Sequence, residues 1–173
     1  SYFTAGSLGR LLERLGFAIT RVDIEYSDQY LTVEATPARV DGVNTLGAPS
    51  DLAQLASLVE SFPERTGRTI DDWSRRISGW ARDGKRVVVW GSGSKGVSFL
   101  TTVPGAAEAV EYAVDINPYR QGFYMAGTGQ KIVAPGDLPE LKPDVVVVMN
   151  RVYVAEISRA LDSLGLAPEI VAL

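Results

Sequence analysis

The architecture of this chain follows from one segment, Arg86-Val87-Val88-Val89-Trp90-Gly91-Ser92-Gly93-Ser94-Lys95-Gly96. Its first half is an uninterrupted apolar run, which is typical of a strand buried on both faces of a parallel sheet. Its second half fits the pattern G-x-G-x-x-G, and a helix is predicted to begin at the end of this pattern, over residues 95–102. A strand, a glycine-rich turn and a helix in this order provide the context that a dinucleotide-type binding motif requires.

The sequence that follows alternates predicted strands with predicted helices. Strands are predicted at residues 110–114, 131–133, 145–149 and 168–173, and helices at residues 136–141 and 152–164. Such alternation is typical of a parallel sheet with right-handed crossovers. We therefore expect the α/β class, with a Rossmann-like doubly wound parallel sheet in residues 85–173.

Two further zones precede this sheet. Leucines at positions 8, 11, 12 and 15 lie on one helix face, and alternating residues then predict a hairpin of strands 18–26 and 30–35. A helix and one hairpin form a poor core alone, so residues 1–37 need a further sheet to join.

Residues 38–84 are predicted to hold a linker and two helices, 51–61 and 70–82, separated at Pro63. Trp73, Trp80 and Trp90 are expected to pack in cores.

The glycine loop is the candidate binding site. Glycines at positions 91, 93 and 96 allow a tight turn and a close approach of the backbone to a ligand. Free N–H groups at the start of the helix attract an anion, and Ser92, Ser94 and Lys95 add donors and a positive charge. The alternative is a tight strand-to-helix turn that binds nothing.

Polar residues at the ends of the next strands extend this candidate site. Asp115 is expected at the carboxyl edge of the sheet, where it would accept ribose hydroxyls, or alternatively cap the turn at Asn117. The long polar and aromatic connection 117–130 includes Thr128 and is expected to contribute to binding. Asn150 also ends a strand there, with helix capping as its first expected task.

Composition narrows the possible functions. The net charge is −4 with both signs mixed along the chain, which argues against nucleic acid or an anionic membrane as the main partner. The chain has no histidine and no cysteine, so the commonest metal ligands and a thiol nucleophile are missing. We expect no bound metal and a cytoplasmic location.

Several linked motifs resemble one known family. The motifs are Trp90 to Gly96, Val114-Asp115-Ile116-Asn117-Pro118 with Gln121-Gly122, Ala126-Gly127-Thr128, Pro143-Asp144, and Met149-Asn150 with Glu156-Ile157. In this order they resemble the C-terminal domain of S-adenosylmethionine-dependent C-methyltransferases, whose best-known members methylate nucleotide-linked deoxysugars. Residues 1–37 likewise resemble the last helix and hairpin of the methyltransferase domain that precedes it.

The resemblance implies that the methyl donor and the substrate bind to different domains. S-adenosylmethionine is expected to bind the upstream methyltransferase domain, outside this chain. This chain is expected to hold a phosphorylated or nucleotide-linked small molecule at Gly91 to Gly96, with Asp115, Asn117, Thr128 and Asn150 nearby. The catalytic histidine of sugar-modifying relatives has no counterpart here, so no catalytic residue is assigned and the isolated chain is expected to be inactive.

Two other functions stay open at this stage. The glycine loop and Asp115 also suit an NAD-dependent oxidoreductase, although the predicted sheet is expected to lack the second of the two mononucleotide-binding halves. The other alternative is a structural or interaction module that has kept the loop but binds no ligand.

Overall fold

The structure is a computed structural model that describes residues 2–38 and 47–173. The chain divides into two units, Ser1–Glu64 and Arg65–Leu173. Part of the expected linker falls at residues 39–46, outside the described residues. No helix of the described ranges is long and apolar enough to cross a membrane.

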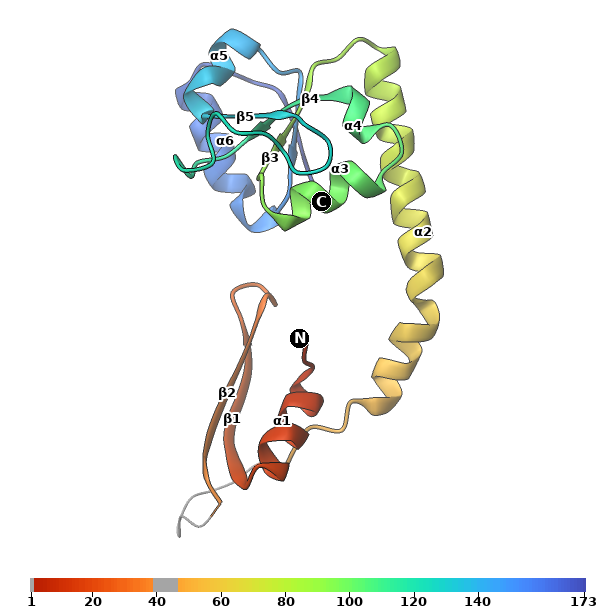
Figure 1. The fold of residues 1–173 in the computed structure, drawn as a ribbon, viewed down its shortest axis with the longest axis vertical. Coiled ribbons are helices and arrows are strands. Elements are labelled where there is room, and N and C mark those ends of the chain that lie inside the picture. The colour runs from red at the N-terminus through yellow and green to blue at the C-terminus, as the bar shows by residue number, and fades with distance from the viewer. Residues whose placement is uncertain (1, 39–46) are drawn as a thin grey trace. The chain divides into compact units, whose positions relative to one another are not determined.

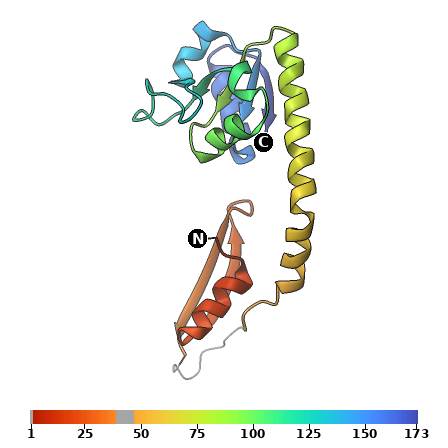
Figure 2. The ribbon, with the colours of Figure 1, turned by 45° about the vertical axis from the view of Figure 1, so that its right-hand side comes forward.

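The first unit holds a helix and a hairpin, as predicted. Helix α1 (Ala5–Arg14) begins at a capping box formed by Thr4 and Ser7. Strands β1 (Phe17–Glu25) and β2 (Tyr30–Pro37) pair antiparallel, and Figure 2 shows α1 beside them. The turn between the strands contains positive φ angles at Tyr26, Ser27 and Asp28.

The predicted break at Pro63 is wrong. Helix α2 (Leu52–Arg82) is continuous, with Pro63 inside it. Proline removes one N–H donor, its own, whereas the N–H groups of the following residues still find carbonyl acceptors one turn earlier. The apolar face of the second half is also buried, at Trp73, Ile77 and Trp80, which offsets the local cost of the proline.

The second unit is built on a parallel sheet of five strands (Figure 1). The strands are β3 (Val87–Trp90), β4 (Val110–Val114), β5 (Lys131–Val133), β6 (Val145–Val148) and β7 (Glu169–Ala172). The other elements are α3 (Ser94–Thr102), α4 (Ala106–Ala109), η1 (Pro135–Asp137), α5 (Leu138–Leu141), η2 (Arg151–Tyr153) and α6 (Val154–Ser163). The predicted Rossmann-like α/β fold is confirmed, whereas the short helix α4 was not predicted.

Strand β3 separates two apolar cores. Val87 and Val89 pack with α2 and α3 on one face of the sheet. Val88 and Trp90 pack with α5 and α6 on the other face. All four residues are at most 8% exposed, which explains why the strand reads as a continuous apolar run.

The strand order is β5-β4-β3-β6-β7, so successive strands are added first on one side of β3 and then on the other. The carboxyl ends of β3 and β6 therefore border the topological switch point, where open α/β sheets bind ligands. The order also corrects the expectation of a single half-sheet, because β6 and β7 begin the second half. That expectation was wrong because strand counting cannot assign strands to the two sides of a sheet.

Candidate functional site

The turn after β3 has the sharp geometry that its glycines permit. Gly91 has φ of +123°, and its amide donates to the Val114 carbonyl at 2.8 Å. A β-carbon at Gly96 would lie 2.3 Å from the Gly91 carbonyl oxygen. The helix α3 therefore begins directly against the end of β3, and glycine at position 96 is required for that approach.

Asp115 closes one side of the turn. Its Oδ2 accepts hydrogen bonds from the Ser92 amide at 3.1 Å and from the Ser92 hydroxyl, and its Oδ1 accepts from the Asn117 amide at 2.9 Å. Ser92, predicted to donate to a ligand, donates here to Asp115, and its role toward a ligand stays a prediction. The predicted capping of the turn by Asp115 is present, and its role toward a ligand stays a prediction.

Arg120 completes this cluster from the long connection between β4 and β5. Its Nη1 donates to the Ser92 hydroxyl oxygen at 3.3 Å and lies 3.6 Å from Asp115 Oδ2. Burial raises the pKa of Asp115, but hydrogen bonds from Ser92 and Asn117 and the charge of Arg120 outweigh it, and the pKa is lowered overall. Asp115 is therefore a carboxylate at neutral pH.

The start of α3 carries the backbone groups that are predicted to bind an anion. Within residues 2–38 and 47–173, no hydrogen-bond acceptor is found for the amides of Ser94, Lys95 and Gly96. These are the first three amides of a helix, whose dipole adds a partial positive charge. The side chains of Ser94 and Lys95 are exposed beside them.

A cavity of about 350 Å³ opens at the carboxyl edge of the sheet, on the face covered by α6. It is bordered by Trp90 and Gly91 at the end of β3, by Asp115 and Ile116 after β4, and by Met149 after β6. It therefore lies at the topological switch point that the strand order defines, directly beside the glycine loop.

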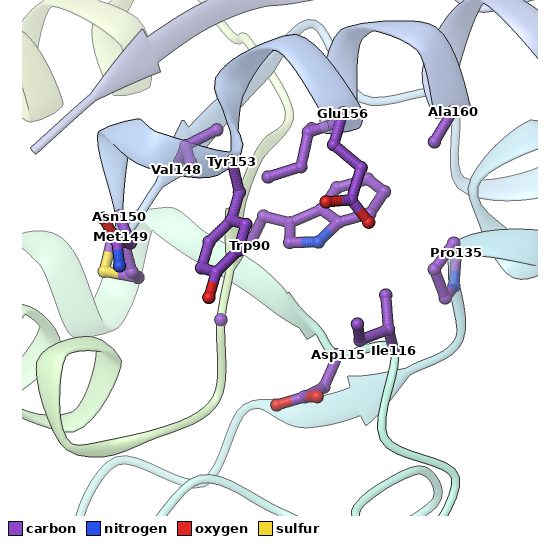
Figure 3. A pocket seen from close by; sticks show the side chains of 12 residues that line it. Trp90, Asp115, Ile116, Pro135, Val148, Met149, Asn150, Tyr153, Glu156 and Ala160 are labelled. Carbon is purple, nitrogen blue, oxygen red and sulfur yellow. The ribbon is translucent and has the colours of Figure 1, made fainter. Parts of the chain in front are cut away.

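Residues of α6 and the turn before it form the opposite wall. Figure 3 shows Tyr153 and Glu156 extending from this wall into the space that Ile116 and Pro135 border from the other side. Asn150 also lines the cavity, and its side chain accepts from the Val152 amide at 3.3 Å. The capping role predicted for Asn150 is therefore confirmed, and the residue faces the cavity as well.

Two predicted site residues lie elsewhere. Asn117 is exposed and forms a second turn, in which its Oδ1 accepts from the Tyr119 amide at 3.0 Å. Thr128 does not line the cavity, and a β-carbon at its neighbour Gly127 would contact the Thr101 side chain at 3.6 Å. Gly127 thus lies beside Thr101 of α3, and the predicted role of Thr128 in binding remains untested.

Of the residues that line the cavity, only Gly91, Asp115 and Asn150 were predicted as site residues, and those missed include Trp90, Tyr153 and Glu156. Trp90 was assigned to the core, where it does pack, but it also borders the cavity. One signal was present for the others, because residues 150, 153, 156, 157 and 160 recur at helical spacing after a strand end. No group of three or more potential metal ligands is found in the described parts of the chain.

Comparison with known proteins identifies the family. The model of the C-methyltransferase C-terminal domain matches residues 31–166. The chain belongs to this family. A search of curated proteins gave no match.

Solved structures that are similar to this chain include RSP, a Rex-family repressor. Its complex with β-NAD+ and operator DNA is 12% identical, with a TM-score of 0.39 over 51% of this chain and 49% of that chain. Its complex with β-NADH gives the same identity and TM-score over 53% of that chain. The chain thus spans about half the length of the structures it matches, and this degree of similarity supports no functional argument.

Proposed function

We propose that this chain is the substrate-binding portion of an S-adenosylmethionine-dependent C-methyltransferase. Its ligand is a phosphate-bearing small molecule, in the first instance a nucleotide-linked sugar. The observation that carries the proposal is the joint position of two features at the carboxyl edge: the acceptor-free amides of Ser94, Lys95 and Gly96, and the cavity at the end of β3.

The two features suit two parts of one ligand. The α3 amides and the Lys95 charge bind a phosphate, as helix N-termini in this position do. The cavity has mainly apolar walls and accepts an uncharged group attached to that phosphate. Because both features adjoin Gly91, one ligand of nucleotide size reaches both.

The family implies S-adenosylmethionine, which supplies an electrophilic methyl group when bound. The group that this chain offers most clearly is the start of α3, where the amides of Ser94, Lys95 and Gly96 and the Lys95 charge suit an anion. S-adenosylmethionine does not fit that group, because it has no phosphate and its sulfonium and ammonium give it a net positive charge. We therefore assign the donor to another domain and assign this chain to holding the methyl acceptor.

Isothermal titration calorimetry of the purified chain tests this proposal. The titrants are a nucleoside-diphosphate sugar, NADH and S-adenosylmethionine. We expect heat from the nucleotide sugar and none from S-adenosylmethionine. Tight binding of NADH alone would favour an oxidoreductase domain, for which the glycine loop and Asp115 are the supporting features, and no heat from any titrant would favour an interaction module.

A further inference from the structure

We infer that Glu156 selects the group that enters the cavity, and that this group is a nucleobase whose edge offers two adjacent N–H donors, as guanine does. The inference rests on the proposed function, because it concerns the same cavity and the same phosphate-bearing class of ligand. It adds the chemical identity of the inserted group and the residue that recognises it.

Charge determines which end of the ligand enters. Of the side chains that line the cavity, Asp115 and Glu156 are acidic and none is basic. A phosphate inside would face both carboxylates, and Arg120, which pairs with Asp115, is not among the residues that line the cavity, so this position is unfavourable at short range. The phosphates therefore stay outside at the α3 amides, and the uncharged end of the ligand is inserted.

The walls suit a flat ring. The indole of Trp90 borders the cavity, and Ile116 and Pro135 contribute apolar surface opposite α6 (Figure 3). Aromatic surfaces such as an indole pack favourably against planar rings. The volume of about 350 Å³ falls in the range of sites that enclose small molecules, so a base fits inside while its phosphates remain at the rim.

Glu156 is the acidic residue available for recognition. Asp115 is occupied by Ser92 and Asn117, whereas no hydrogen bond or ion pair is found for Glu156 within the described residues. An ionised carboxylate accepts through both oxygens and donates nothing. Guanine presents N1–H and an amino group side by side, which match both oxygens. Adenine and cytosine place an acceptor nitrogen beside their amino group, and uracil has one N–H between two carbonyls.

The test is calorimetry of GDP, CDP, ADP and UDP with the wild-type chain, Glu156→Gln and Glu140→Gln. Glu140 is exposed on α5 and does not line the cavity, so it controls for the loss of one charge. We expect wild-type and Glu140→Gln to bind GDP at least about tenfold more tightly than UDP, the size of a charge-assisted hydrogen bond. In Glu156→Gln, GDP binding falls by about tenfold and UDP binding stays nearly unchanged.

The outcomes separate this inference from the proposed function. If all four nucleotides bind the wild-type chain equally, or Glu156→Gln keeps the full preference for GDP, the inference is overturned and the proposed function stands. If none binds, both are overturned. Should Glu156→Gln fail to fold, Glu156→Asp decides instead. It retains the carboxylate and should keep the GDP preference at reduced affinity, and loss of the ranking in a folded Glu156→Asp would count against the inference.

Discussion

The two edges of the parallel sheet each carry an aspartate with a lowered pKa, but they are organised differently. At the amino edge, Asp144 accepts from the Arg86 amide at 2.8 Å and from its Nε at 3.3 Å. The hydrogen bond from the Arg86 amide is the main cause of the lowered pKa of Asp144. At the carboxyl edge, Asp115 stabilises a turn, and among the described residues the neighbouring amides of Ser94, Lys95 and Gly96 have no acceptor.

The difference shows that a lowered carboxyl pKa does not by itself mark a binding site. The amino edge even borders the larger hollow, about 520 Å³ against about 350 Å³. Of its three charged lining residues, Arg86 and Asp144 are paired with each other, however, and the glycine loop does not line it. Unsatisfied backbone donors beside a cavity, rather than volume or pKa, distinguish the carboxyl edge.

The largest expected effect comes from Gly96→Ala. The added methyl group would meet the Gly91 carbonyl oxygen at 2.3 Å, so the start of α3 must shift. We expect a loss of about 2–3 kcal/mol in the free energy of unfolding, as for other overpacked sites, and loss of nucleotide binding. Chemical denaturation and calorimetry measure the two effects.

The matched control is Gly67→Ala, also in a helix. A β-carbon at Gly67 would meet no atom within 4 Å, so this change should stabilise α2 by about 0.5–1 kcal/mol and leave binding intact. Equal stability effects of the two substitutions would contradict the packing role of Gly96.

A smaller effect is expected from exchanging the two aspartates for asparagine. Asp115→Asn removes an acceptor shared by Ser92 and Asn117, and the looser turn should weaken nucleotide binding by about tenfold. Asp144→Asn should lower stability without changing the dissociation constant. If Asp144→Asn weakened binding as much as Asp115→Asn, the contrast between the edges would be lost.

Lys95→Ala should have a moderate effect on binding. The Lys95 side chain is exposed beside the backbone amides at the start of α3. Water and dissolved ions therefore screen its attraction for a phosphate. We expect about a threefold weaker dissociation constant at low salt, with the difference from wild type shrinking as salt is added. Lys142→Ala, at the hollow of the amino edge, should show no such change.

The strands and the glycine loop could be predicted from the sequence, because buried valine runs and glycine spacing are local signals. Val87 to Trp90 and Val145 to Val148 were recognisable by hydropathy alone. The cavity was not predictable in this way, because it depends on bringing Ile116, Tyr153 and Glu156 together across the sheet edge. The continuity of α2 through Pro63 was also missed. The prediction considered only the local cost of a proline in a helix, and not the burial of Trp73, Ile77 and Trp80 in the second half of α2.

The smallest expected effect is on how the free energy of unfolding changes at acidic pH. The pKa of Asp115 is below its ordinary value of 3.8 in the folded chain, so its contribution is present above that value and is lost as the pH falls through the folded pKa. Asp115→Asn should therefore lose less stability than wild type between about pH 5 and pH 3. Urea unfolding across this range measures the difference, and parallel curves for the two proteins would argue against the assigned hydrogen bonds.

The central claim is that the carboxyl edge binds a phosphate-bearing ligand, and NMR of the ¹⁵N-labelled chain tests it most directly. During titration with the tightest-binding nucleoside diphosphate, the largest amide shifts should occur at Ser94, Lys95 and Gly96, with further shifts around Glu156. Shifts concentrated at Arg86 and Asp144 on the amino edge, or no saturable shifts at all, would contradict it.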